Sequence, residues 1–393
     1  MKNTGVCARG IKTPIFQKGD DLVKEICDSV CLASKEDGFT LEDRDIIAVT
    51  EAVVGRTQGN YASCEQIAAD VRSKFGSGPL GAVFPILSRN RFSILLRAIA
   101  MAVEKVYVQL SYPADEVGNE IFDSTLLEEI SVNPYSDNFN EKEFRSVFGH
   151  KTIHKFTGID YIELYKSLGS NIEIVFSNDP RYILTYTGNV LCCDIHSRFR
   201  TKATLKKAGA QLVLGLDNIL SSSINGSGYN SEYGILGSNK ASENNVKLFP
   251  RDCDRFTKDL QSALKSRTGK HIEVMVFGDG GFKDPVGGIW ELADPVISPA
   301  YTEGLAGVPN EIKIKFLADT DFKNLTGEAL AQAVRERIRS KDKDLVGKMS
   351  SEGTTPRKFS DLLGSLSDLV SGSGDRGTPV VLIQNYFSNY ASE

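Results

Sequence analysis

The chain has 393 residues, of which 41% are hydrophobic and 25% charged, and its formal net charge at pH 7 is -5. This is the composition of a globular protein, and the length predicts roughly two or three domains. The acidic balance argues against a broad basic surface, so we expect no nucleic-acid partner.

The cysteines and the N-terminus favour a cytoplasmic protein. Seven cysteines are present, none of them in a CxxC pair, and a chain of this size does not need disulfides, so we interpret them as reduced thiols. The first residues, MKNTGVCARG, lack the apolar segment of a secretory signal. The most apolar stretch is interrupted by Arg97 and Glu104 and is too short to span a bilayer. We therefore expect a cytoplasmic protein without a membrane partner.

The first 76 residues are predicted to alternate helices and strands. Apolar residues at helical spacing follow the acidic pair at 20–21, which suits a helix N-terminus. The β-branched run DIIAVT at 45–50 predicts a buried strand, and the glycines at 55 and 59 predict a loop. Ser63 and Gln66 have the spacing of a capping box, which predicts a helix of about three turns.

The middle section, residues 77–220, follows the glycine-rich boundary GSGPLG and is predicted to contain a helix near 90–104. Strands are expected at KVYVQL, IEIVFS, RYILTYT and NVLCCDI. Residues 221–393 begin with a polar linker. They are predicted to contain strands at EVMVF, EIKIKF and TPVVLIQ and helices after LFPRD, near 325–340 and near 357–370. Because no regular βαβ order emerges, we predict an α+β fold.

Generic catalytic and metal motifs are absent or weak. There is no GxxxxGK[ST] P-loop and no GxSxG nucleophile elbow, and the GxGxxG at 372–377 follows a helix, so we interpret it as a turn. His150 and His154 are four residues apart but lack the glutamate of an HExxH motif. In CCDIH (192–196) the two cysteines would alternate faces of a strand, so zinc is not expected there.

The segment EVMVFGDGGFKDPVGG carries the most suggestive chemistry. Asp279 and Asp284 lie in a glycine-rich turn after an apolar strand, where the backbone can approach phosphate closely. Carboxylates are the ligands that Mg²⁺ and Mn²⁺ prefer, so both aspartates are candidate metal ligands. An ordinary turn is the alternative, because Gly and Asp are common in turns.

Several segments, in the same order, resemble the coenzyme F(420)-0:L-glutamate ligase family. GIKTPIFQKGDDL (10–22) and LEDRDIIAVTEAVVGRTQGN (41–60) are similar to the family's PLI-type loop, its GDDL helix start and its strand with the following QKIVSKAEG loop. YGILGSN (233–239) and LFPRDCDRFTKDL are similar to AG-V-D-x-S-N and LLPxDPDxSAxxL. VFGDGGFKDP and DLLGSLSDLVSGSGDRGTPVVLIQ resemble the family's SDTFGRP turn and its DELASAADLVMG…GxPVVxIRG ending.

The resemblance implies a two-domain gamma-glutamyl-ligase-like fold of mixed sheets and helices. Residues 1–76 and 221–393 would form the N-terminal and C-terminal parts of the ligase-like domain. Residues 77–220 would be a middle insertion, for which we recognise no counterpart. Family members are dimers, so a homodimer is expected.

The resemblance also implies a ligase that forms a γ-glutamyl amide bond. In the family, GTP phosphorylates an acceptor carboxylate, and the amine of glutamate then attacks the acyl phosphate. This chemistry depends on positioning and on charge neutralisation by metal ions. We therefore expect GTP or ATP with Mg²⁺ or Mn²⁺, a small carboxylate acceptor and L-glutamate.

The family's site residues can be carried over one by one. Its first metal aspartate falls on Asp279. Its nucleotide-binding positions fall on Thr13, Pro14, Ile15, Phe16, Glu51, Arg56 and Asn239.

Three departures leave the activity open. The family's second metal aspartate falls on Leu236, the threonine after the first on Gly280, and a lysine on Ala52. One alternative is therefore a non-catalytic or re-purposed member that binds a nucleotide, an anionic ligand or a partner protein. Another is that the middle section sets a different anionic substrate, because guanidinium groups bind carboxylates and phosphates. Its candidate residues are Arg181, Arg198, Arg200 and Lys202.

Overall fold

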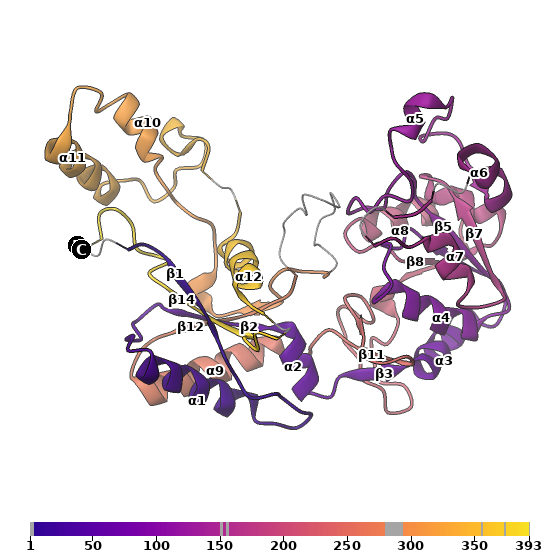
Figure 1. Cartoon of the computed structure of the whole chain (residues 1–393), viewed down its shortest axis with the longest axis horizontal. Helices are drawn as coiled ribbons and strands as arrows, with labels where there is room; N and C mark the ends of the chain where they lie inside the picture. Colours follow the sequence, from indigo (N-terminus) through magenta and orange to yellow (C-terminus); the bar gives the residue numbers. More distant parts are fainter. Residues whose placement is uncertain are drawn as a thin grey trace.

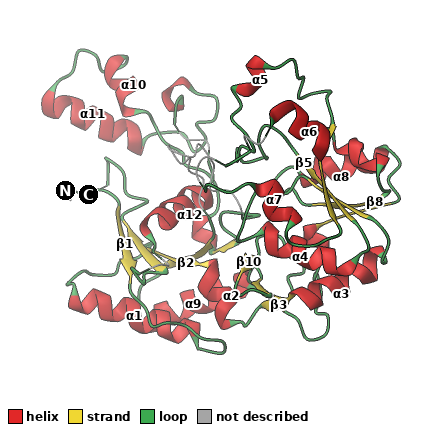
Figure 2. Ribbon diagram, turned by 45° about the vertical axis from the view of Figure 1, so that its right-hand side comes forward, coloured by secondary structure: helices red, strands yellow, loops and turns green. Residues whose placement is uncertain are grey.

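The computed structural model describes residues 4–149, 152–154, 157–279, 294–354, 357–372 and 375–392. In these ranges, a five-stranded sheet in the order β1-β14-β2-β12-β13 is built from the two ends of the chain. A six-stranded sheet in the order β6-β7-β5-β4-β8-β9 is built from the middle. A small sheet, β10-β11-β3, lies between the two in both views (Figures 1 and 2).

The five-stranded sheet brings residues from opposite ends of the sequence side by side (Figure 1). β2 and β12 run parallel at its centre, and the other strand pairs are antiparallel. Every residue of β12 and β14 is buried, as the apolar runs EVMVF and TPVVLIQ predict. The strands are β1 (Cys7–Ile11), β2 (Ile46–Thr50), β12 (Glu273–Phe277), β13 (Ala300–Tyr301) and β14 (Val380–Gln384).

Helices cover both faces of this sheet. α1 (Leu22–Glu36) and α9 (Cys253–Thr268) pack on one face, with the core that contains Ile47 and Val274. α12 (Phe359–Val370) packs on the other face, with the core that contains Phe277. Segments from the two ends of the chain therefore share one sheet and its cores, whereas α3 (Cys64–Phe75) and Leu236 pack in the core of the middle section.

The middle sheet is mainly parallel. Its first strand, β4, lies at the centre; the chain moves outward to β5 and β7 and returns to β8 and β9 on the other side. This is the strand order of a doubly wound sheet, whose switch point lies between β4 and β8. The strands are β4 (Leu80–Val83), β5 (Val106–Leu110), β6 (Phe139–Asn140), β7 (Ile172–Phe176), β8 (Asn189–Cys192) and β9 (Leu212–Gly215).

The capping box predicted at Ser63 is confirmed. The Ser63 side chain accepts from the Gln66 N–H, the Gln66 side chain accepts from the Ser63 N–H, and α3 begins one residue later. α3 packs against α4, and Leu236 belongs to the same core. The domain boundaries at residues 76 and 220 remain predictions. The helices of this part are α3 (Cys64–Phe75), α4 (Phe92–Ala102), α5 (Leu126–Glu129), α6 (Glu141–Phe148), α7 (Tyr161–Lys166), η1 (Pro180–Thr185), α8 (Arg198–Lys207) and η2 (Leu216–Asn218).

The α+β class is confirmed, but three local predictions are wrong. RYILTYT forms η1, because Pro180 has no N–H for a strand ladder and the Asp179 side chain accepts from the Arg181 N–H. EIKIKF continues into α10 (Ile314–Asp319), of which Leu317 alone is buried, and it pairs with none of the sheets in the described ranges. The loop expected at 55–59 is mostly helix, α2 (Glu51–Thr57).

The remaining helices and strands lie outside the two large sheets. α10 and α11 stand apart from the five-stranded sheet in both views (Figures 1 and 2). None of the helices in the described ranges combines the length and the apolar character needed to cross a membrane. The bounds are β3 (Tyr61–Ser63), β10 (Asn239–Lys240), β11 (Asn245–Lys247), η3 (Glu303–Leu305), α11 (Gly327–Arg339) and η4 (Met349–Ser351).

Candidate functional site

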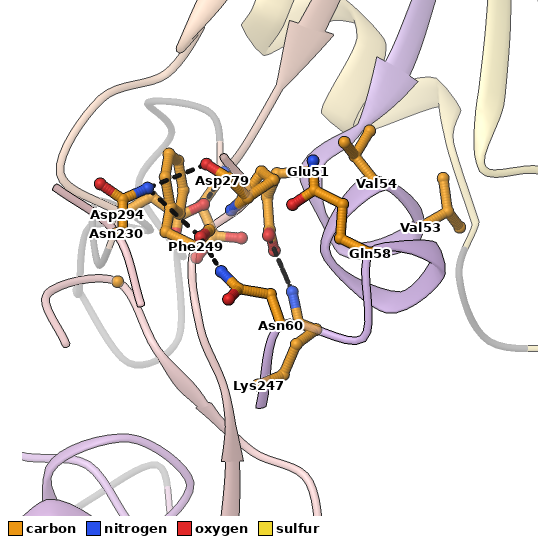
Figure 3. A network of polar contacts seen from close by, with 12 residues as sticks. Glu51, Val53, Val54, Gln58, Asn60, Asn230, Lys247, Phe249, Asp279 and Asp294 are labelled. Atoms are coloured by element: carbon orange, nitrogen blue, oxygen red, sulfur yellow. Dashed lines mark hydrogen bonds and ion pairs between the residues drawn. The ribbon is translucent and has the colours of Figure 1, made fainter. Parts of the chain in front are cut away.

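Acidic residues meet at the carboxyl ends of the two parallel strands of the five-stranded sheet. Glu51 directly follows β2, and Asp279 lies two residues beyond β12. β2 and β12 pair Thr50 with Phe277, so the residues after them lie at the same edge. Asp294 joins them, because its Oδ2 accepts from the Asp279 N–H at 2.8 Å. We call Glu51, Asp279 and Asp294 the acidic edge (Figure 3).

Arg91, from the middle section, binds two of these carboxylates at once. Its Nη2 lies 2.5 Å from Asp279 Oδ2, and its Nη1 lies 2.8 Å from Asp294 Oδ1. The Asp294 side chain is 2% exposed and that of Arg91 is 15% exposed, so water screens this pair little. The Asp279 side chain is 33% exposed, so water screens its pair with Arg91 more. Burial lowers the pKa of Arg91, but Asp294 and Asp279 raise it by more, and the guanidinium stays charged.

Two carboxyls of the acidic edge, Asp279 and Glu51, have a raised pKa. Burial, and then the nearby charge of Asp294, raise the pKa of Asp279 to about 7, although Arg91 opposes the shift. Burial also raises the pKa of Glu51, and Lys247 opposes that shift. Asp279 can therefore exchange a proton near neutral pH, as a general acid or base must.

Lys247 neutralises Glu51. The Lys247 Nζ lies 2.8 Å from Glu51 Oε1 and 2.7 Å from Oε2, and the two side chains point toward each other in Figure 3. β10 pairs with β11 and places Asn239 opposite Lys247. The predicted nucleotide-binding residues Glu51 and Asn239 are thus connected through Lys247.

Asn60 ties the neighbouring loops to this site. Its Nδ2 donates to the carbonyls of Tyr229 and Phe249, at 3.1 and 2.8 Å. Its Oδ1 accepts from the Tyr229 N–H and from Arg251 Nη1, at 3.0 and 2.6 Å. Asn230 adds a bond to the carbonyl of Pro250 at 2.9 Å. The loops that carry residues 229–230 and 249–251 are therefore held together (Figure 3).

A pocket of about 350 Å³ opens beside these loops. It shares Asn230 and Arg251 with the Asn60 network, and Arg251 lies 4.8 Å from the centre of the Tyr229 ring. Arg255 and Glu232 also line it, so its wall carries both charges. A polar pocket of this size suits part of a charged small molecule.

The predicted PLI-type loop lies at the other end of α2. The Arg56 Nε donates to the Phe16 carbonyl at 2.6 Å, so two predicted nucleotide-binding residues are in contact. Phe16 is buried in the core, Ile15 is 85% exposed, Pro14 is exposed, and the Thr13 N–H donates to the Gly377 carbonyl. α2 thus connects the PLI-type loop to Glu51 at the acidic edge.

The other candidate residues have ordinary surroundings. Leu236 is fully buried in an apolar core, and Cys192 and Cys193 are buried thiols whose pKa is raised by burial. His154 is buried, and its ring accepts from the Thr157 N–H. His150, Gly280 and Asp284 lie outside the described residues.

The basic residues of the middle section are mostly paired with carboxylates of their own neighbourhood. Arg181 binds Asp179 at 2.6 Å. Asp217 lies 2.6 Å from Lys202 Nζ and 3.5 Å from Arg198 Nε. Arg200 is exposed at the start of α8. These partners do not belong to the acidic edge, so the role of the basic residues as an anion site remains a hypothesis.

The described carboxylates do not by themselves make up a divalent-metal site. Asp279 and Asp294 already bind the Arg91 guanidinium, and Glu51 binds the Lys247 ammonium. In the described ranges, no group of three or more His, Cys, Asp or Glu side chains could hold a metal ion. An ion between Asp279 and Asp294 would have to displace Arg91.

Sequence reasoning missed Arg91, Asp294, Lys247 and Asn60. Arg91 and Asp279 are 188 positions apart, and no local pattern marks a contact at that separation. Asn60 stands next to Gly59 at a predicted loop, which signals a turn but not the network that it forms.

The sequence profile of the family described as F420-0:Gamma-glutamyl ligase matches residues 10–385 of this chain. A search of curated proteins finds no match. The profile match runs through the middle section as well as both ends, and so extends beyond the segments that resemble the family's motifs. It confirms the resemblance, and the chain belongs to the F420-0:Gamma-glutamyl ligase family.

Proposed function

We propose that this protein joins the amine of L-glutamate to a carboxylate acceptor, with GTP or ATP as the phosphoryl donor. The observation that carries the proposal is the convergence of Glu51, Asp279 and Asp294 with the cations Arg91 and Lys247 at one sheet edge. The family's description names the acceptor class, so the proposed acceptor is coenzyme F(420)-0 and the product its γ-glutamyl amide.

The proposed reaction has two steps. An acceptor carboxylate oxygen first takes the terminal phosphoryl group of the nucleotide, and the nucleoside diphosphate leaves. The glutamate amine then attacks the acyl carbon; a C–N bond forms, the C–O bond to phosphate breaks, and phosphate departs. Fixed cations favour both steps, because negative charge develops on phosphate oxygens. Asp279, with its pKa raised to about 7, suits acceptance of a proton from the amine.

Nucleotide binding is proposed for Thr13, Pro14, Ile15, Phe16, Glu51, Arg56 and Asn239. The contact of Arg56 with the Phe16 carbonyl, and the link from Asn239 through Lys247 to Glu51, support this assignment. Mg²⁺ or Mn²⁺ enters the proposal as the counter-ion of the nucleotide phosphates, since the described carboxylates are already paired. A homodimer, as the resemblance implies, is part of the same proposal.

Calorimetry with GTP, and separately with ATP, each with Mg²⁺, tests nucleotide binding. The wild type should bind at least one nucleotide. Arg56→Ala should weaken binding, because Arg56 holds the PLI-type loop through the Phe16 carbonyl, whereas Arg337→Ala, which removes a half-exposed guanidinium on α11, should not. No heat with either nucleotide would contradict the proposal.

A non-catalytic member that binds a nucleotide or another anion is the second candidate. The observation that favours it is the double ion pair of Arg91, which occupies carboxylates that could otherwise bind a metal. This candidate predicts nucleotide binding without consumption of the nucleotide. Phosphate release that depends on both glutamate and acceptor would exclude it.

A further inference from the structure

We propose that Arg91 is the resident cation of the acidic edge: the middle section supplies a guanidinium between Asp279 and Asp294 that excludes a divalent ion from these carboxylates. Arg91 is thus a positioning residue that acts through Asp279 and Asp294. Its place in a ligase rests on the proposed function. The exclusion of metal does not, and can be measured without turnover.

The two ion pairs hold the guanidinium between carboxylates. Nη2 faces Asp279 and Nη1 faces Asp294, at 2.5 and 2.8 Å. The two aspartates are themselves joined, because the Asp279 N–H donates to the second Asp294 oxygen at 2.8 Å. A cation held by two linked carboxylates occupies the position that a bridging metal ion would need.

The acidic edge requires a cation. Asp294 is almost fully buried, and it raises the pKa of both Asp279 and Glu51, so the three carboxyls repel one another. Lys247 is committed to Glu51. Buried carboxylates without a counter-charge are strongly unfavourable, so removal of Arg91 leaves Asp279 and Asp294 in need of another cation or a proton.

The β4–α4 loop and Gly237 position the Arg91 side chain at the acidic edge. Arg91 ends the β4–α4 loop, which leaves the middle sheet at its switch point, where ligands bind in doubly wound sheets. Its N–H donates to Ser88 Oγ at 2.8 Å, and its Nη1 reaches the Gly237 carbonyl at 3.4 Å. Gly237 has φ +72, and a Cβ there would lie 2.6 Å from Pro295 Cδ, so a larger residue would disturb this approach.

A simpler interpretation is that Arg91 only tethers the middle section to the five-stranded sheet. The two interpretations differ in one observable. A tether that is lost destabilises the protein and leaves metal binding unchanged or weaker, whereas loss of a resident cation exposes a vacant pair of carboxylates and strengthens metal binding.

Binding of Mn²⁺ alone, followed by electron paramagnetic resonance, tests the proposal on the full chain without nucleotide. Arg91→Ala should bind Mn²⁺ more tightly than the wild type, on the order of tenfold or more, because a positive charge leaves a weakly screened site. Arg91→Lys keeps the charge and should bind as weakly as the wild type. The double variant Arg91→Ala/Asp279→Asn should lose the gain.

Arg97→Ala is the matched control, because Arg97 lies on α4 and pairs with the exposed Glu243. It should leave Mn²⁺ affinity unchanged. An unchanged Mn²⁺ affinity in a folded Arg91→Ala would overturn the proposal. If circular dichroism shows that Arg91→Ala does not fold, Arg91→Gln, which keeps hydrogen-bond donors without the charge, gives the same comparison with the same deciding outcomes.

Failure of the proposed ligase function and failure of the resident-cation proposal give different combinations of results. Absence of ligation in the wild type, together with the Mn²⁺ gain in Arg91→Ala, contradicts the ligase reaction and supports the resident cation. Ligation without the Mn²⁺ gain contradicts the resident cation and supports the reaction.

Discussion

At the scale of single residues, the site depends on charges that are buried together with their partners. Glu51 and Lys247 have side chains that are 6% and 12% exposed, so each is an unfavourable group without the other. The β11 strand positions Lys247, and α2 positions Glu51. The stability of the fold around Glu51 therefore depends on the intact Glu51–Lys247 ion pair more than on either residue alone.

Lys247→Met is predicted to lower the free energy of unfolding by roughly 3–5 kcal/mol, because it leaves the Glu51 carboxylate buried and unpaired. The double variant Glu51→Gln/Lys247→Met should be less destabilised than Lys247→Met. Urea unfolding of both variants and the wild type measures this difference. A double variant that is as unstable as the single one, or less stable, would refute the argument.

Asp194 is another buried carboxyl, two residues beyond β8. Its Oδ2 accepts from the hydroxyls of Ser197 and Thr201, at 2.7 and 2.6 Å, and its Oδ1 has no hydrogen-bond partner among the residues that the structure describes. Burial raises its pKa from 3.8 to about 6. The folded state therefore holds this proton to a higher pH than the unfolded state, and the contribution of Asp194 to stability falls as pH rises between these two values.

In the variant Asp194→Asn this side chain cannot ionise, so the variant should not lose stability through this position as the pH rises. Its melting temperature relative to that of the wild type should rise between about pH 4 and pH 6, in the window that linkage predicts. Thermal unfolding followed by circular dichroism at several pH values provides the measurement. A difference that stays constant across this range would show that Asp194 does not titrate as described.

At the scale of elements, the sequence correctly predicts the secondary structure of segments whose local residue pattern matches the way they pack in the fold. DIIAVT and TPVVLIQ form buried strands, and Ser63 with Gln66 caps α3. RYILTYT and EIKIKF have strand-like composition but form helical turns, because strand propensity depends on a neighbouring strand. The parallel order of the middle sheet was not predicted, since its connections include helices as short as α7 and η1.

Gly234 shows how closely the segment at 233–239 packs. It has φ +54, and a Cβ there would meet the carbonyl oxygens of Ile219, of Leu216 at 2.6 Å and of Asp217 at 2.8 Å. Gly226 also has positive φ, at +75, but no atom lies within 4 Å of its Cβ position. A substitution at Gly226 therefore tests backbone strain alone, whereas one at Gly234 tests strain together with steric overlap.

Gly226→Ala is predicted to destabilise the fold by roughly 1–2 kcal/mol, from left-handed strain alone. Gly234→Ala should cost clearly more, because backbone carbonyls cannot move aside as a flexible side chain can. Chemical denaturation of the two variants side by side gives both values. Equal losses would mean that the carbonyl contacts at Gly234 are easily relieved.

At the scale of the whole molecule, two sheets contribute residues to one site. The ends of the chain form the five-stranded sheet, and residues at the carboxyl ends of β2 and β12 form most of the acidic edge. The middle sheet contributes Arg91 across 188 and 203 positions of sequence, to Asp279 and Asp294. The strand pattern of the sequence predicted Asp279 as a site residue, and the family resemblance added Glu51. Neither predicted Arg91, because no local pattern encodes a contact between two sheets.

The most direct test of the account is the ligation reaction itself. Wild-type protein is mixed with coenzyme F(420)-0, L-glutamate, GTP and Mg²⁺, and the products are analysed by mass spectrometry. We expect an acceptor that is heavier by one glutamyl residue, in a reaction that needs GTP or ATP and that Asp279→Asn abolishes. A wild type that binds nucleotide yet leaves the acceptor unchanged with both GTP and ATP would contradict it.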